Sequence, residues 1–167
     1  MILFEPAHLK TIVDAAEAAS PAETCGLLLG TRERPDDGTP AQVARVVASR
    51  NLAADPHQHF EIDPALRLRL QREGRAAGLM VIGHYHSHPD GPARPSPADL
   101  AAAWEADMVW VIVALVAGQA VHLTAWEPAP DGTHFREIAL HTSPWQPGPT
   151  GPARVLDSLT RRAKPEK

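Results

Sequence analysis

The strongest constraint on the fold lies between residues 79 and 99, where an apolar stretch ends in closely spaced histidines. Residues 79–89 read LMVIGHYHSHP, and side chains two apart on an extended chain, such as His86 and His88, point to the same side. A loop rich in proline and glycine follows. Residues 96–99, SPAD, then have the pattern of a helix start, with serine as N-cap and proline at the first helical position. The segment therefore predicts a strand that ends in imidazoles, followed by a helix whose first turn carries a carboxylate.

Two imidazoles and a carboxylate form a ligand set that zinc uses in enzymes, with one position left for water. His86, His88 and Asp99 are the candidate ligands, and the helix dipole also favours an anion at Asp99. Two plainer interpretations remain open. A histidine pair is not rare in a chain with nine histidines, and Ser96 with Asp99 could serve only as a helix cap. Cap and ligand roles are compatible, because a cap fixes where Asp99 points.

Three further histidines need separate treatment. His84 shares the face of His86 and His88, but residues 84 and 88 of an ideal strand are about 13 Å apart, at roughly 3.3 Å per residue. We therefore expect His84 in the wall of the site rather than on the ion. His57 and His59 repeat the spacing without a following carboxylate, so we expect them in a loop near the substrate path.

A hydrolytic zinc site also needs a group that takes the proton of water and passes it to the leaving amine. Among 20 acidic residues, Glu23 stands out because it precedes a short apolar strand over residues 24–29 and could lie at the mouth of a cleft. A solvated glutamate after a turn is the alternative. Cys25, in the same strand, is expected to be a buried core residue rather than a nucleophile.

Strand and helix patterns alternate along the first 142 residues. Apolar spacing and end signals predict helices over 6–19, 64–77 and 97–106. In the second helix, Leu66, Leu70 and Ala77 are expected to face inward. Strands are predicted around 24–29, 43–47, 60–62, 79–85, 108–116, 120–126 and 135–140. Interleaved strands and helices with clear hairpins predict an α/β or α+β fold with a mixed sheet.

Length and composition favour one domain over residues 1–142 of the 167. From residue 143 to 167, prolines alternate with glycines, and the segment contains five basic and two acidic residues. This composition predicts a flexible, basic C-terminal tail.

The charge balance and the single cysteine limit the cellular compartment and the classes of partner that we expect. A net charge of −4 without a basic block gives no reason to expect nucleic acid or an anionic membrane as partner. One cysteine excludes an intrachain disulfide and a four-cysteine zinc site. The first residues lack the pattern of a signal peptide, and the longest apolar run, 108–117, is about half of a membrane span. We therefore expect a protein of the reducing cytoplasm.

Glu23, the HSHP at residues 86–89 and the serine and aspartate at 96 and 99 together resemble the JAMM signature of the MPN-plus metalloproteases. That signature is an upstream glutamate and H-x-H-P-x6-S-x2-D, and six residues separate Pro89 from Ser96 here. Residues 21–30 and 60–64 are also similar to family segments, and the order of elements is similar over residues 1–142. The resemblance implies a cytidine-deaminase-like fold, with a mixed, curved sheet flanked by helices.

The resemblance also implies roles for the candidate residues. His86, His88 and Asp99 would hold one Zn²⁺, Glu23 would be the general acid/base, and Ser96 would stabilise the oxyanion. The family cleaves amide bonds, often after the C-terminal Gly-Gly of ubiquitin or ubiquitin-like proteins. This chain is most similar to the compact bacterial branch, which includes peptidases of sulfur-carrier proteins such as one bearing a C-terminal cysteine adduct.

The resulting expectation is a zinc-dependent hydrolase that cleaves a peptide or isopeptide bond after the C-terminal Gly-Gly of a ubiquitin-like or sulfur-carrier protein. Two alternatives stay open: a zinc amidohydrolase for a small substrate, and a catalytically silent scaffold of the same fold that binds partner proteins. The complete ligand set argues against the scaffold, since such forms usually lose ligands. The sequence does not decide the oligomeric state and leaves a homodimer open.

Overall fold

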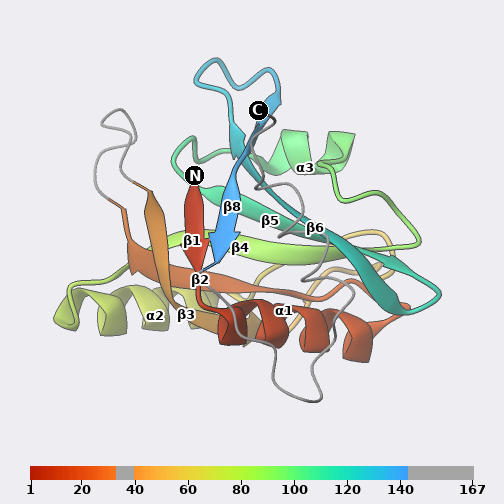
Figure 1. Ribbon diagram of the computed structural model, residues 1–167, viewed down its shortest axis with the longest axis horizontal. Coiled ribbons are helices and arrows are strands. Elements are labelled where there is room, and N and C mark those ends of the chain that lie inside the picture. Colours follow the sequence, from red (N-terminus) through yellow and green to blue (C-terminus); the bar gives the residue numbers. More distant parts are fainter. Residues whose placement is uncertain (33–39, 143–167) are drawn as a thin grey trace, which may run out of the picture.

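The fold is that of a computed structural model, in which residues 1–32 and 40–142 are described (Figure 1). Three helices and eight strands occupy these residues. The helices are α1 (Pro6–Ala19), α2 (Pro64–Ala76) and α3 (Pro97–Ala102). The strands are β1 (Ile2–Phe4), β2 (Cys25–Thr31), β3 (Ala41–Ser49), β4 (Met80–Pro89), β5 (Val109–Val116), β6 (Gln119–Pro128), β7 (Phe135–Ile138) and β8 (Leu140–Thr142).

All eight strands form one mixed sheet in the order β7-β6-β5-β4-β2-β3-β1-β8. The β4–β5, β1–β3 and β1–β8 pairs are parallel, and the other pairs are antiparallel. Ala139 alone separates β7 from β8, yet these strands lie at opposite edges of the sheet. The sheet must therefore curve until its edges approach each other. The predicted α+β class with a mixed, curved sheet flanked by helices is confirmed.

The two long helices pack on different apolar clusters. The buried face of α1, Leu9, Ile12, Val13 and Ala16, belongs to the larger cluster, which also includes Leu28 of β2. The buried leucines of α2 join the smaller cluster, which contains the flanking residues Leu27 and Leu29. Successive residues of a strand point to opposite faces. The two helices therefore cover opposite faces of the sheet.

A bulge in β4 decides which face the histidines occupy. Leu28 pairs with Gly83 and Leu29 with Val81, so Ile82 has no partner in β2 and the register shifts there. Beyond the bulge, Leu27 pairs with His84, which puts His84 and the histidines at alternate positions after it on the face that α2 covers. Such an extra residue re-aims the side chains that follow it.

β4 also runs to Pro89, four residues beyond the predicted end at residue 85. Its last seven residues pair in parallel with β5, from Gly83 opposite Val109 to Pro89 opposite Leu115. Both candidate histidine ligands, His86 and His88, are therefore held by strand hydrogen bonds rather than by a loop.

Several predicted elements need correction. The helix at 97–106 ends at Ala102, because the chain leaves helical geometry at Ala103 (φ −83°, ψ 62°). The strand predicted at 60–62 is only an isolated bridge between Asn51 and Ile62. The strand predicted at 135–140 is two strands, because its halves pair at opposite edges of the sheet. β1 was not predicted, since three residues carry too little periodicity.

The inward face of α2 differs from the prediction at one position. Ala77 is exposed and is the C-cap of the helix, while Gly74 is buried in its place. A Cβ on Gly74 would lie 2.8 Å from the carbonyl oxygen of Leu79. The chain therefore folds closely over the end of α2 at a position where only glycine fits.

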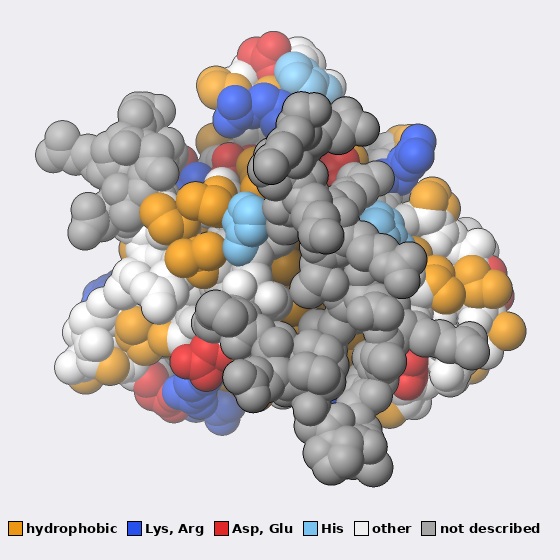
Figure 2. All heavy atoms as spheres, viewed as in Figure 1, with side chains coloured by type: hydrophobic (Ala, Val, Ile, Leu, Met, Phe, Trp, Pro, Cys, Tyr) orange, Lys and Arg blue, Asp and Glu red, His pale blue; other side chains and the backbone are white. Residues whose placement is uncertain are grey.

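On the face shown in Figure 2, Lys and Arg side chains lie beside Asp and Glu side chains, with hydrophobic groups between them. None of the helices in residues 1–32 and 40–142 is long and apolar enough to cross a membrane. Residues 33–39 and the predicted tail at 143–167 lie outside the described residues.

Candidate metal centre and catalytic cleft

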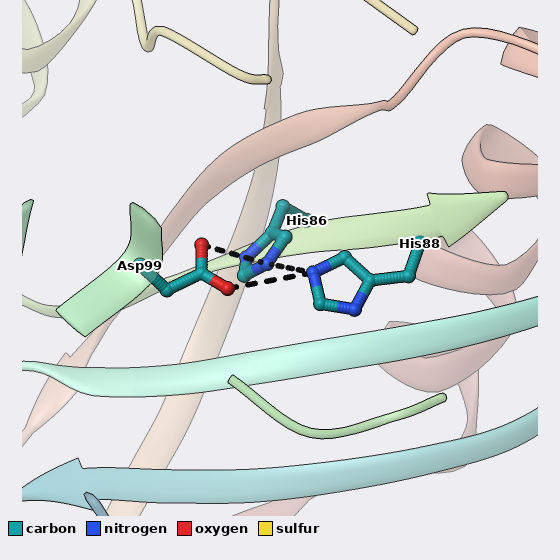
Figure 3. Close-up of side chains that lie close together, drawn as sticks. All are labelled: His86, His88 and Asp99. Atoms are coloured by element: carbon teal, nitrogen blue, oxygen red, sulfur yellow. Dashed lines mark hydrogen bonds and ion pairs between the residues drawn. The ribbon is translucent and has the colours of Figure 1, made fainter. Parts of the chain in front are cut away.

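Three side chains converge at the end of β4 (Figure 3). His86 and His88 come from the strand, and Asp99 comes from the first turn of α3. The two Nε2 atoms lie 3.0 Å apart. The carboxylate oxygens of Asp99 lie 3.4 Å from His86 Nε2 and 3.5 Å from His88 Nε2. One ligand atom from each residue lies within 4.8 Å of the other two.

Hydrogen bonding and stacking orient the two imidazoles. His88 Nδ1 lies 2.9 Å from the carbonyl oxygen of Pro92; a carbonyl only accepts, so Nδ1 carries the proton and the neutral ring presents a lone pair at Nε2. The ring of Phe60 stacks on His86 at 4.3 Å between centroids and 17° between planes. An outer partner that sets the tautomer is the usual support of a histidine that binds metal.

The electrostatics of the cluster favour a cation. Burial would raise the pKa of Asp99, but its interactions with the His86 and His88 rings and with the Ser96 N–H outweigh it and hold this pKa well below its usual range. Burial lowers the pKa of His86, which is fully buried. An ionised carboxylate and a neutral imidazole are the forms that bind metals. A cation between the two Nε2 atoms would also remove the repulsion of facing lone pairs, so the donor set fits zinc.

Ser96 and Asp99 form the predicted helix cap. The Asp99 N–H donates to Ser96 Oγ (3.1 Å), and the Ser96 N–H donates to Asp99 Oδ2 (2.6 Å). The cap and the cluster therefore use the same carboxylate. The reciprocal bonds fix Asp99 and hold the Ser96 hydroxyl beside it.

Glu23 lies in the same cleft, immediately before β2, and its side chain is largely shielded from solvent at 7% exposure. Burial raises the pKa of Glu23 to about 7, although His88 lowers it and Asp99 raises it further. A carboxyl with such a pKa can take up and release a proton near neutrality, as a general acid/base requires.

Backbone contacts tie Glu23 to the histidine strand. The Thr24 N–H donates to the Ser87 hydroxyl (2.9 Å), and the Ser87 N–H donates to the Thr24 carbonyl (3.1 Å). On the other side, the Asn51 amide donates to the carbonyls of Glu23 (3.0 Å) and His59 (2.9 Å). The backbone at Glu23 is thus fixed from two directions.

The cleft has a volume of about 420 Å³ and joins the candidate catalytic groups to a largely apolar chamber. Glu23, His88, Ser96 and Asp99 line one end. The walls come from strands β2 and β5, helices α2 and α3 and the loops beside them, and they include Leu27, Phe60, Ile62, Ala102, Trp104, Met108 and Trp110. The structure thus brings the five predicted site residues together, with His86 directly behind His88.

The other histidines do not join the cluster. His84 is buried in the cleft wall, where its ring lies edge-on to Trp110 at 4.1 Å between centroids and tilted against Phe60 at 5.5 Å. Burial lowers the pKa of His84 to about 3, so its ring is neutral at physiological pH. His59 lines the cleft, and His57 Nδ1 lies 3.2 Å from the carbonyl of Pro21.

Cys25 is fully buried in β2. Burial raises the pKa of its thiol to about 11. A thiol of this kind is a poor nucleophile, in keeping with the expectation that Cys25 belongs to the core.

Sequence reasoning missed two residues that position the site, Ser87 and Asn51. Ser87 stands between the two histidines, and strand alternation alone could have shown that it points to the opposite face. Its bond to Thr24 depends on the pairing of two distant strands. Asn51 lies in a loop where no local pattern distinguishes it.

The sequence is similar to several characterised proteins. A desampylase from Haloferax volcanii is 31% identical over 128 residues, which are 76% of this chain and 83% of that protein. A desampylase from Pyrococcus furiosus is 32% identical over 111 residues, 66% of this chain and 73% of that protein. A probable TtuB-protein conjugate cleaving protease from Thermus thermophilus is 36% identical over 81 residues, 48% of this chain and 49% of that protein.

Solved structures share the fold. A solution structure of a protein from Desulfitobacterium hafniense has a TM-score of 0.72 at 30% identity and covers 86% of this chain and 93% of its own. A JAB1/MPN domain protein from Archaeoglobus fulgidus has a TM-score of 0.52 at 22% identity and covers 85% of this chain and 98% of its own. Residues 5–128 match the family described as prokaryotic homologs of the JAB domain, which confirms the resemblance drawn from the sequence: the chain belongs to this family.

Proposed function

We propose that the protein is a zinc-dependent hydrolase that cleaves the peptide or isopeptide bond after the C-terminal Gly-Gly of a ubiquitin-like or sulfur-carrier protein. Membership of the JAB family supports a hydrolase. The names of the relatives, two desampylases and a probable conjugate cleaving protease, support protein conjugates as the substrate class.

One observation carries the proposal more than any other. A buried carboxyl with a pKa near 7 shares a cleft with three convergent metal ligands and a hydroxyl. A purely structural cap would need Ser96 and Asp99 only, and would not need Glu23 to be buried beside them. The arrangement has the parts that amide hydrolysis by water requires.

In this proposal, His86, His88 and Asp99 hold the metal. Zinc, when bound, lowers the pKa of water and polarises a carbonyl group. The Glu23 carboxylate accepts the proton of the attacking water and delivers it to the amine that leaves. The Ser96 hydroxyl donates a hydrogen bond to the carbonyl oxygen as negative charge develops there.

The shape of the cleft fits a chain end better than a folded surface. A volume of about 420 Å³ accommodates a short extended segment. Two glycines would suit the part of the cleft lined by Glu23 and Ser96, since they bring no side chains. We place the activity in residues 1–142 and the protein in the reducing cytoplasm, in keeping with a single cysteine that is buried and unpaired.

The test uses Glu23→Gln, with Glu137→Gln as matched control, because Glu137 is exposed on β7 away from the cleft. Full-length protein loaded with zinc is incubated with a Gly-Gly-ended modifier fused to a second protein, with and without chelator, and cleavage is followed by mass spectrometry. Glu23→Gln should keep about one zinc per chain and lose at least roughly 100-fold in rate, the usual effect of a general base. The control should match the wild type.

Three results would contradict the proposal. Cleavage that survives in Glu23→Gln would show that another residue is the base. Cleavage that survives the chelator would show that the reaction does not need the metal. Hydrolysis of small amides without any cleavage of the fusion would favour an amidohydrolase.

A further inference from the structure

Trp104 is the most exposed large hydrophobic side chain in the described residues, at 88% exposure. It lies just beyond the end of α3 and lines the catalytic cleft. Tryptophan usually buries a large part of its surface, and an exposed one at the rim of a cleft indicates a surface that another molecule covers.

The loop that carries Trp104, residues 103–108, is anchored at two points. Glu105 accepts a hydrogen bond from Arg67 of α2 (2.6 Å). The carbonyl of Asp107 accepts one from Arg32 (2.7 Å), whose guanidinium is held in turn by Glu127 (2.9 Å). The loop segment that carries the indole is therefore anchored before any partner arrives, which reduces the entropy lost on binding.

The position of Trp104 sets which part of a bound chain it can reach. From Asp99 to Ala102 the helix rises about 4.5 Å, at roughly 1.5 Å per residue. At Ala103 the chain turns, and the Trp104 N–H donates to the Ala102 carbonyl (3.0 Å), so the two further residues add less than the span of about 7 Å that an extended chain has at roughly 3.3 Å per residue. Trp104 therefore lies at most about 11 Å from Asp99 along the chain, which an extended substrate covers in roughly three residues. Two glycines bring no side chains, so the first side chain that the indole can meet is that of the residue before them.

The chemistry around the indole selects an uncharged, apolar side chain. Ala98, Ala102 and Met108 line the same part of the cleft. The nearby charges, Arg67 and Glu105, are paired with each other. The charges of these two groups already compensate each other, so an apolar side chain fits this rim better than a charged one.

We propose that Trp104 is a specificity-determining residue that binds the apolar side chain of the residue preceding Gly-Gly in the tail of the modifier. This inference rests on the proposed function above. It assigns Trp104 to the modifier rather than to the released protein, because all conjugates of one modifier share the tail of the modifier and differ in the protein attached to it. A preformed binding contact is useful for the shared tail and not for the variable protein.

The experiment measures kcat and KM on two modifier fusions that differ only at the residue before Gly-Gly, leucine in one and glycine in the other. Wild type, Trp104→Ala and Trp104→Phe are compared in the full-length, zinc-loaded protein. Leu68→Ala is the matched control, since Leu68 is an exposed apolar residue of α2 (55% exposure) outside the cleft.

Trp104→Ala should raise KM for the leucine substrate about tenfold, the effect of losing an aromatic anchor, with kcat within twofold of wild type. Its KM for the glycine substrate should change less than twofold. Trp104→Phe should restore most of the preference, and Leu68→Ala should leave both substrates unaffected. The pattern is that of lost binding rather than lost chemistry.

Equal KM values for wild type and Trp104→Ala on the leucine substrate would overturn the inference. A rise in KM of similar size on both substrates would also overturn it, because the indole would then contact something other than that side chain. If the wild type cleaves neither fusion, the proposed function fails instead. That outcome is distinct, since it does not involve the variants.

Discussion

The two faces of β4 differ in how their polar groups are satisfied. Tyr85 packs into the large apolar cluster beneath α1, and Ser87 exchanges two hydrogen bonds with Thr24. The opposite face carries three histidines, and Nδ1 of both His84 and His86 is buried without a partner among the described residues. The face toward α1 carries one such unpartnered atom in the described residues, the Tyr85 hydroxyl oxygen.

This difference shows how one strand can serve both stability and chemistry. A buried polar group without a partner costs roughly 1–3 kcal/mol, so a protein tolerates several of them mainly where they serve a function. The face toward α1 has one such atom among the described residues, at Tyr85, and the cleft face has two. The cleft face also carries the candidate metal ligands, and substitutions on the two faces should therefore fail in different ways.

The largest effect is expected from Asp99→Ala, which breaks the cleft face only. It removes a ligand, so zinc affinity should fall by more than about 100-fold, since losing even an outer partner of a ligand costs roughly 10–100-fold. Titration against a competing chromophoric chelator measures this. Asp99→Asn separates ligand from cap, because its amide oxygen can still accept from the Ser96 N–H. Zinc affinity of wild-type strength in Asp99→Asn would contradict the assignment of the carboxylate as ligand.

A smaller effect concerns pH and compares metal-free wild type with Glu23→Gln. Burial raises the pKa of Glu23 from 4.5 to about 7, so the folded state binds this proton more tightly than the unfolded chain. Its contribution to stability is full below about pH 4.5 and is lost as the pH rises through about 7. From pH 4.5 to 8, the free energy of unfolding of the wild type should fall by roughly 2–3 kcal/mol relative to that of Glu23→Gln. Urea unfolding in the presence of chelator measures the free energy of both proteins. Parallel curves of this free energy against pH would show that Glu23 titrates normally.

The smallest effect is expected on the other face. Ser87→Ala leaves the buried Thr24 N–H unpaired and should lower the free energy of unfolding by about 1–2 kcal/mol. Zinc affinity should stay within a few-fold of wild type. Tyr85→Phe is the control, because the hydroxyl it removes makes no hydrogen bond in the described residues and its loss should cost less. If Ser87→Ala weakens zinc binding but not folding, the two faces are not separable.

Local rules predicted the parts of the molecule that local geometry determines. Helix α1 begins and ends at the predicted residues 6 and 19, since its apolar spacing and a flanking proline mark both ends. The convergence of His86, His88 and Asp99 follows from strand alternation and from a cap motif. Each of these features is contained in fewer than about fifteen consecutive residues.

What the sequence did not predict depends on pairing over long distances. The split of residues 135–142 between two edges of the sheet requires the curvature of the whole sheet. The course of residues 103–108 after α3 depends on bonds from Arg67 and Arg32, which are far away in sequence. The same holds for Ser87, whose partner Thr24 lies 63 positions earlier.

The strand β1 has a consequence for synthesis on the ribosome. Its neighbours in the sheet are β3 and β8, and Ile2 pairs with Leu140 (Figure 1). At about 5–20 residues per second, roughly 7–28 s pass between the synthesis of these two residues. Throughout that time Ile2 and Phe4, both buried in the finished protein, lack one of their covering strands. Residues 2–4 are thus among the last to be enclosed, and the nascent chain must avoid other contacts through this apolar segment until residue 140 is made.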